Sequence, residues 1–399
     1  MHSTIASASA GPAGTVHATK PPVQRLLSLD VVRGITIAFM IMVNNNGGPG
    51  SWRFMNHAVW NGLTPTDLVF PTFVFVVGVS VVFAFDARLA RGSSRAQLAR
   101  HTVQRAVILI LFGIIVNSFP FFELPHMRFY GVLQRIGICY LVVGLFYLWD
   151  NRVSTKVIAL IGCLVGYWAL LRWAPIPGVG TPGRDVPFMD MTQNLVSWID
   201  RALFPHHLYL YAPDHNVRDP EGLLSDLPAI GTALMGILAG LWLRAQKSVA
   251  IKAAGLAAAS LVSLVLGYLW SMEFPLNKNM WTSSFVLVAG GYSLALLAVC
   301  FWAIEQQGWR KGWTWVWLVF GSNAIAVYMF SELLPGVLDN VRMASAAGHP
   351  INLNIFIFEH VFAPIPDPHW AAFAYSVSFT AVCFIPVWIL YRKKIFLKV

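Results

Sequence analysis

Charged residues are scarce in this chain of 399 residues: they make up 12% of it, against ~25% in an ordinary soluble domain. Hydrophobic residues make up 57%, more than a soluble core of this size hides from water. An intrinsically disordered chain is excluded as well, because disorder requires low hydrophobicity. The composition therefore predicts an integral membrane protein.

Several other features are missing. The four cysteines all lie inside apolar runs and none has CxxC spacing, so neither a disulfide framework nor a zinc site is predicted. Residues 1–24 contain no hydrophobic core of a signal peptide, and we expect a disordered cytoplasmic tail there. HExxH, GxSxG and Walker motifs are all absent, and no metal site is expected.

What the chain does have is a series of long apolar runs. A helix needs about 20 residues to cross the ~30 Å hydrocarbon layer. Ten runs meet this requirement, at about 29–47, 64–85, 103–119, 130–149, 155–174, 223–243, 250–271, 282–303, 314–335 and 371–391. The run 355–366 is too short to span and is predicted to be re-entrant or interfacial. We expect one all-α transmembrane domain over 25–399, a polytopic bundle of about ten helices.

Lys and Arg predict the orientation of this bundle. With both termini in the cytoplasm, eighteen of the 28 basic residues fall in the inner connections, seven in the outer ones and three within spans. The net charge of +10 is thus a topology signal, and nucleic acid is not an expected partner. The two long outer connections, about 175–222 and 336–370, are the expected recognition surface.

The densest polar cluster follows the first span. Residues 44–46 are asparagines, a glycine-rich turn comes next, and His57 lies ten residues before Asp67. An isolated loop histidine is most often a surface residue. Here the neighbouring asparagine, Trp60 and aspartate side chains could orient an imidazole and donate hydrogen bonds to a developing oxyanion.

Further polar residues lie in or beside other spans. Asp30 and Arg33, at i and i+3, can pair at the inner start of the first span. The direction of the spans places six others in the outer half of the bundle: Gln134, Arg135, Asp226, Lys278, Trp281 and Glu332. Asn323 is placed nearer the middle. Each alone is more often a packing contact between helices than a ligand. Together they predict a hydrated cavity that opens outward.

Several motifs in this order resemble those of the heparan-α-glucosaminide N-acetyltransferase family of transmembrane acyltransferases. They are SLDVVRG, HAVWNGLTPTDLVFPTFVFVVG, GVLQRIG, DPEGLLSDLPAIGTALMGILAG, PLNKNMWTSSFVL, FGSNAIAVYMFSELL and YRKKIFLKV. The resemblance covers about 26–399. The animal lysosomal members carry a luminal domain and an extra span before the first motif, which this chain lacks. A bacterial-type member is therefore expected, in the cytoplasmic (inner) membrane with the active-site loop facing the periplasm.

The resemblance implies transfer of acetyl from cytosolic acetyl-CoA to an amino sugar on the far side of the membrane. Combined with the positions of the polar residues, it implies a set of site residues. We expect His57 and one of Asn44, Asn45 and Asn46 to be catalytic; Arg33, Arg105, Arg135, Lys278 and Trp281 to hold the donor; and Trp60, Asn61, Asp67, Asp226, Asn323 and Glu332 to contact the acceptor or support the site. Arg135 is also a candidate supporting residue.

Two other classes of protein remain open. A multi-span transporter of a polar solute or sugar would use the same intramembrane charges, but no repeat symmetry between halves is visible. A membrane scaffold would leave the charged residues and the His57 cluster without a purpose. The expected partners are acetyl-CoA, a glucosamine-like or glycan acceptor and the lipid bilayer, and the sequence leaves open whether the chain forms a homodimer.

Overall fold

The computed structural model describes residues 26–209, 217–344 and 349–397. The expected disordered tail, 1–24, lies outside these ranges. The helices are α1 (Leu27–Asn44), α2 (Val69–Ala90), α3 (Arg95–Ser118), α4 (Val132–Trp149), α5 (Val153–Trp173), α6 (Leu195–Leu203), α7 (Asp226–Arg244), α8 (Val249–Trp270), α9 (Ser283–Phe301), α10 (Thr314–Ser322), α11 (Ala324–Asn340), α12 (Leu353–Ile357) and α13 (Pro368–Arg392). Single turns are η1 (Arg53–Met55), η2 (Pro65–Leu68), η3 (Leu124–His126), η4 (Trp302–Gln306) and η5 (Phe358–Phe362), and the strands are β1 (Arg342–Ala344) and β2 (Pro350–Asn352).

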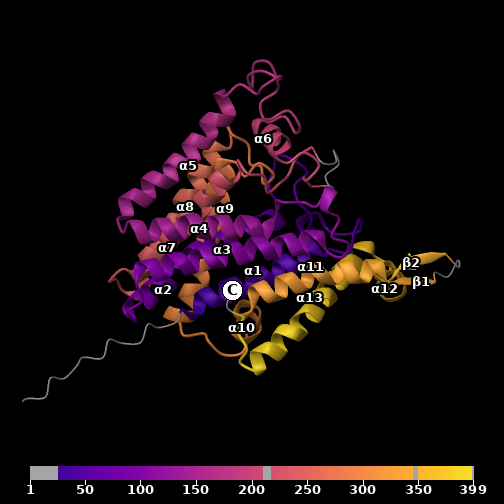
Figure 1. The fold of residues 1–399 in the computed structure, drawn as a ribbon. Helices are drawn as coiled ribbons and strands as arrows, with labels where there is room; N and C mark the ends of the chain where they lie inside the picture. The colour runs from indigo at the N-terminus through magenta and orange to yellow at the C-terminus, as the bar shows by residue number, and fades with distance from the viewer. Residues whose placement is uncertain (1–25, 210–216, 345–348, 398–399) are drawn as a thin grey trace, which may run out of the picture.

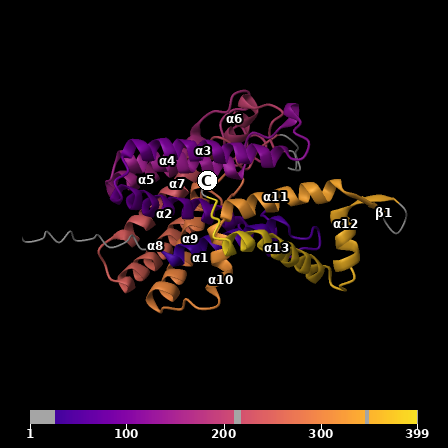
Figure 2. The same ribbon diagram turned by 60° about the horizontal axis from the view of Figure 1, so that its bottom comes forward.

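The described chain is a helical bundle, as the composition predicts (Figure 1). Nine of its described helices are long and apolar enough to cross a membrane, and the bent pair α10 and α11 makes a tenth. Each coincides with one of the ten predicted spans. The sheet in the described part is a single antiparallel hairpin of β1 and β2, which projects from the bundle beside α12 (Figures 1 and 2). The run predicted to be too short to span is α12 with η5.

The long helices differ in how far the protein covers them. More than 60% of the apolar window is buried inside the protein in α1, α2, α4, α7 and α9, but less than 30% in α3, α5, α8 and α13. The exposed faces of the second group carry leucine, isoleucine and valine, which suit lipid. These five helices therefore form the centre of the bundle.

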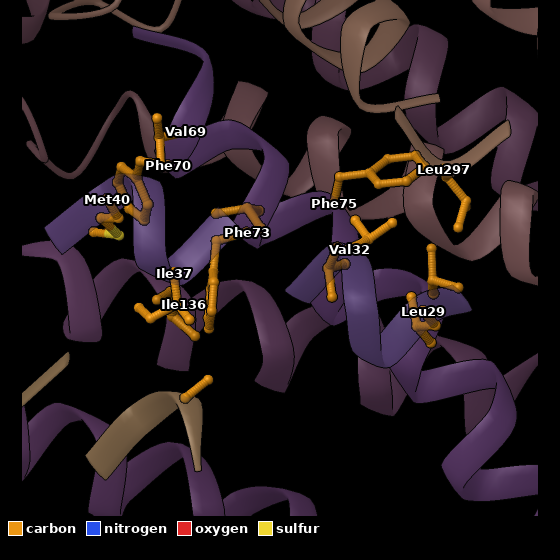
Figure 3. Packing of buried hydrophobic residues seen from close by; sticks show 14 of the residues in the cluster. Leu29, Val32, Ile37, Met40, Val69, Phe70, Phe73, Phe75, Ile136 and Leu297 are labelled. Carbon is orange, nitrogen blue, oxygen red and sulfur yellow. The ribbon is translucent and has the colours of Figure 1, made fainter. Parts of the chain in front are cut away.

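The centre of the bundle is tightly packed. Val32 on α1, Phe75 on α2 and Leu297 on α9 are almost completely buried and lie together (Figure 3). Helices α2 and α7 approach so closely that a Cβ atom at Gly78 would lie 2.0 Å from the Ala233 carbonyl oxygen. Close backbone approach through small residues is the usual way in which membrane helices pack.

One predicted span differs in the structure. The run 314–335 is two helices, α10 and α11, which meet at Asn323 with a bend of 79°. Asn323 is buried, and its amide donates to the Ile395 carbonyl and accepts from the Leu397 N–H. The Asn323 backbone, with φ −130° and ψ 43°, is outside the helical region at the break. Asn323 therefore holds the C-terminal segment, and a contact with the acceptor stays a prediction.

Candidate active site

His57 lies in the connection between α1 and α2. Its Nδ1 is 2.7 Å from Oδ1 of Asp67, which belongs to the η2 turn at the start of α2. The His57 side chain is 46% exposed, whereas the Asp67 side chain is 1% exposed. The expected pairing of these two residues is present, with the imidazole at the surface and the carboxylate beneath it.

The local sequence fixes the Asp67 carboxylate. Thr64 and Asp67 form a capping box, in which the Thr64 N–H and hydroxyl donate to Oδ2 at 2.9 and 3.0 Å. The Ala58 N–H donates to the same oxygen at 3.1 Å. Because Oδ2 holds the turn, Oδ1 is left for the histidine. This arrangement favours the tautomer with the proton on Nδ1, so that the lone pair is on Nε2.

A second loop brings Lys278 to the free side of the imidazole. The Lys278 Nζ lies 3.4 Å from Nε2 of His57. The Gly62 N–H donates to the Leu276 carbonyl at 2.8 Å, and the Asn277 amide donates to Asn61 Oδ1 at 3.1 Å. These two bonds join the loop that precedes α2 to the loop that precedes α9.

The surroundings of His57 favour its neutral form. Burial and the Lys278 ammonium lower the pKa of His57 from its ordinary value of 6.5, and Asp67 only partly opposes them. Burial also lowers the pKa of Lys278, although carboxylates nearby act against it. Neutral histidine near pH 7 is the form that can accept a proton.

A charged cluster beside this pair was not among the predicted site residues. The Arg128 guanidinium donates to Asp219 at 2.7 and 2.5 Å and to Glu221 at 2.5 Å. Burial alone would raise the pKa of Glu221, but the Arg128 and Lys278 cations lower it. The available signal was the acidic, Pro- and Gly-containing DPEG segment ahead of α7, in which sequence reasoning selected only the later Asp226.

Arg135 and Trp281 support the site from inside the protein. Arg135 is 1% exposed; it donates to Asp226 at 2.8 Å and to the Gly222 carbonyl at 3.0 Å, and its guanidinium lies 4.9 Å from the Trp281 ring. The buried Trp281 indole donates to Thr232 on α7. Both side chains thus connect the loops that precede α7 and α9 to the bundle, and contact of either residue with the donor stays a prediction.

The three asparagines at the end of α1 have separate partners. Asn44 donates to Glu332 on α11 at 3.0 Å, and Asn45 donates to the Ile41 carbonyl of its own helix. Asn46 donates to the Met55 carbonyl, which shapes the loop that carries His57. In the described chain none of the three is hydrogen-bonded to His57, so a catalytic asparagine stays a prediction.

The remaining predicted residues lie in two places. Trp60 is close to the pair: its indole donates to the Met189 carbonyl, and the Arg218 guanidinium lies 5.0 Å from its ring. Arg33 lies near the opposite end of α1, where it donates to Asp30 at 3.0 Å and to Ser80 at 2.9 Å. The Arg105 guanidinium lies 4.8 Å from the Tyr140 ring. The predicted donor residues therefore do not converge on one site.

Fold and site together define a polytopic helical membrane protein with a histidine–aspartate pair and a lysine at one end of its bundle. Residues 25–180 match the family model described as "Heparan-alpha-glucosaminide N-acetyltransferase, catalytic". That segment includes His57, Asp67, Arg128 and Arg135 but ends before Lys278.

The chain is 31% identical to human heparan-alpha-glucosaminide N-acetyltransferase, over 95% of this chain and 60% of the human protein. It is 29% identical to the mouse protein of the same name, over 94% of this chain and 60% of that protein. The family resemblance seen in the motifs is thus confirmed, and the chain is homologous to these N-acetyltransferases through nearly all of its length. It spans about 60% of the length of these relatives.

Proposed function

We propose that this protein transfers acetyl from acetyl-CoA in the cytoplasm to the amine of an amino sugar on the outer side of the membrane. The observation that carries the proposal is the position of His57, with Asp67 at Nδ1 and Lys278 at Nε2. An imidazole with a carboxylate behind it is a suitable general base for acyl transfer. The names of the homologous proteins support the same reaction class.

The proposed chemistry begins with the acceptor as a free amine. As its nitrogen attacks the thioester carbonyl, the amine proton passes to Nε2 of His57, and Asp67 stabilises the imidazolium that forms. The Lys278 ammonium lies beside Nε2, where it can stabilise negative charge on the carbonyl oxygen. The carbon–sulfur bond then breaks, and the CoA thiolate recovers the proton. In the two-step form, Nε2 takes the acetyl group first and the amine attacks acetyl-histidine.

The donor and the acceptor approach from opposite sides in this proposal. The distribution of Lys and Arg supports a cytoplasmic position for the inner ends of the helices, on the side where CoA is present. An extended pantetheine arm is shorter than the ~30 Å apolar layer, so its nucleotide end must enter the bundle. Arg33, near the inner end of α1, and Arg105, near the middle of α3, are the proposed contacts for that anionic end. The Arg105 Nε is buried and has no hydrogen-bond partner among the described residues.

The reaction itself is tested with the purified chain in detergent, given labelled acetyl-CoA and glucosamine. The proposal expects labelled N-acetylglucosamine and free CoA in equal amounts. A transporter would bind or move the sugar without acetylating it, so uptake into sealed vesicles without product would contradict the proposal.

Removal of the Lys278 charge is expected to change both rate and pH dependence. Lys278→Met should lower turnover by about 10²-fold, the usual cost of losing one oxyanion donor. Lys278 lowers the pKa of His57, so this pKa should be higher in the variant. The acidic limb of the rate–pH profile, on which the rate falls as His57 becomes protonated, should therefore move to higher pH. The rate is measured against pH, with the exposed inner Lys247→Met as the matched control. An unchanged acidic limb would show that Lys278 does not act on His57.

Arg33→Gln and Arg105→Gln are expected to weaken CoA binding by roughly tenfold each, because a charge-assisted hydrogen bond to phosphate is lost. Binding is measured by calorimetry and thermal unfolding is followed in parallel, since Arg33 also pairs with Asp30. The exposed Arg100→Gln is the control on the same inner side. Unchanged affinity in both variants would exclude these arginines as donor contacts.

A further inference from the structure

A buried carboxyl group on α6 takes no part in the proposed chemistry. Asp200 lies on this short helix among loops (Figure 2) and is 0% exposed. Its Oδ1 accepts from the Leu223 N–H at 3.0 Å, whereas its Oδ2 is buried without a hydrogen-bond partner among the described residues. The Tyr130 hydroxyl, which interacts electrostatically with Asp200, is likewise buried without a partner there. A negative charge on Oδ2 would be neither hydrated nor hydrogen-bonded, which is costly.

The segment 219–225, which leads into α7, packs directly on this carboxyl group. A Cβ atom at Gly222 would lie 1.9 Å from Oδ2 of Asp200, so only glycine allows this approach. The next residue, Leu223, donates its N–H to the other oxygen. Asp200 therefore joins α6 to the segment at two successive residues.

The same segment carries charge that acts on the candidate active site. Its Glu221 accepts from Arg128 at 2.5 Å. The Glu221 carboxylate raises the pKa of His57 and the pKa of Lys278, so it lies within electrostatic reach of both. A shift of this segment against α6 would therefore change the charges around the base.

The surroundings of Asp200 favour its protonated form. Burial raises the pKa of this carboxyl group from 3.8 to about 7, and the Asp219 carboxylate acts in the same direction. The adjacent Arg201 on α6 donates to backbone carbonyls. Three groups oppose the shift in part: the Leu223 N–H, Arg135 and Tyr130. The carboxyl group therefore changes its charge near neutral pH.

We propose that Asp200 is a positioning residue whose protonated form holds the segment 219–225 against α6, and that loss of the proton loosens this contact and the arrangement of Glu221 beside His57. The contact is strongest at acidic pH and weakens as the pH rises toward neutrality. Its effect on acetyl transfer rests on the proposed function, whereas the pH-dependent contact itself does not.

Thermal unfolding in detergent tests the contact without any transfer reaction. Wild type is compared with Asp200→Asn, whose amide carbonyl can still accept from Leu223 and which cannot ionise. Because wild-type Asp200 takes up a proton on folding, its contribution to stability falls as the pH rises from 3.8 to about 7. The unfolding temperature of Asp200→Asn relative to wild type should therefore increase by a few degrees over this interval and stay level above it.

The matched control is Asp185→Asn, at an exposed aspartate of the same outer connection. Its unfolding temperature relative to wild type should not change between about pH 5 and pH 8, because an exposed carboxylate is ionised throughout this range. A pH-independent difference for Asp200→Asn as well would show that Asp200 is ionised in the fold, and would overturn the inference.

Acetyl transfer tests the positioning role. Asp200→Ala loses the bond to Leu223 and should lower transfer by about tenfold at every pH. Asp200→Asn keeps this bond, so it should match the wild type at acidic pH and exceed it above neutrality. A rate ratio of Asp200→Asn to wild type that does not rise with pH would overturn the positioning role. If the wild type acetylates no acceptor, the proposed function fails, and the unfolding comparison still decides whether the contact depends on the proton.

Discussion

His57→Ala is expected to abolish acetyl transfer, with a loss of at least about 10³-fold, because the variant has no base at the site of amine attack. The fold and the affinity for CoA should be almost unchanged. The imidazole lies in a loop and is 46% exposed, so it contributes little to the packing of the helices. Transfer is measured with labelled acetyl-CoA and glucosamine, and the fold is followed by thermal unfolding in detergent.

The matched control for this variant is His360→Ala, an exposed histidine in η5. It should keep normal transfer. Incubation of wild-type protein with labelled acetyl-CoA alone also separates the two routes: label that stays on the wild type but not on His57→Ala selects the acetyl-histidine intermediate. Near-normal transfer by a folded His57→Ala protein would mean that another group is the base.

Asp67→Asn is expected to cost about 10³-fold in transfer, because the residue behind the histidine sets its tautomer. The asparagine carbonyl oxygen can still accept from Thr64 and Ala58, which directs the amide NH₂ toward Nδ1 of His57. Nδ1 of His57 would then accept a hydrogen bond, and the imidazole proton would move to Nε2. Nε2 would no longer have the lone pair that takes the amine proton. The substitution thus leaves the turn in place and disables the imidazole.

The pH dependence gives this prediction a second measurement. Asp67 raises the pKa of His57, so its loss should move the acidic limb of residual transfer to lower pH, opposite in sign to Lys278→Met. Asp86→Asn is the control, since it removes an ion pair with Arg244 at the other end of α2. It should lower stability without shifting the limb. If the acidic limb of the rate–pH profile lies at the same pH in the wild type and in Asp67→Asn, the assigned pairing is contradicted.

Much of the fold could be predicted from the sequence because membrane spans are encoded by composition. Nine of the predicted runs coincide with a single helix and the run 314–335 with a bent pair, since every backbone group in lipid must bond within its own segment. The break at Asn323 could not be predicted in this way. It lies where the Asn323 side chain bonds to the C-terminal segment, more than 70 residues further along the chain.

The candidate site could be predicted only in part, because only some of its contacts are local in sequence. The pairing of His57 with Asp67 follows from a short separation and a local cap. The approach of Lys278 depends on backbone bonds between two loops, such as Gly62 to Leu276, which no periodicity encodes. The contacts of Arg128 with Asp219 and Glu221 likewise join connections that are distant in sequence, so composition alone could not identify them.

The most direct test of the account is a sided transfer experiment in sealed proteoliposomes, with labelled acetyl-CoA in one compartment and glucosamine in the other. Vesicles with His57→Ala protein serve as the control for leakage and for chemical acetylation. The account predicts labelled N-acetylglucosamine in the compartment opposite the donor for wild-type protein, and none for His57→Ala. Product that forms only when donor and acceptor share one compartment, or glucosamine that crosses without acetylation, would contradict it.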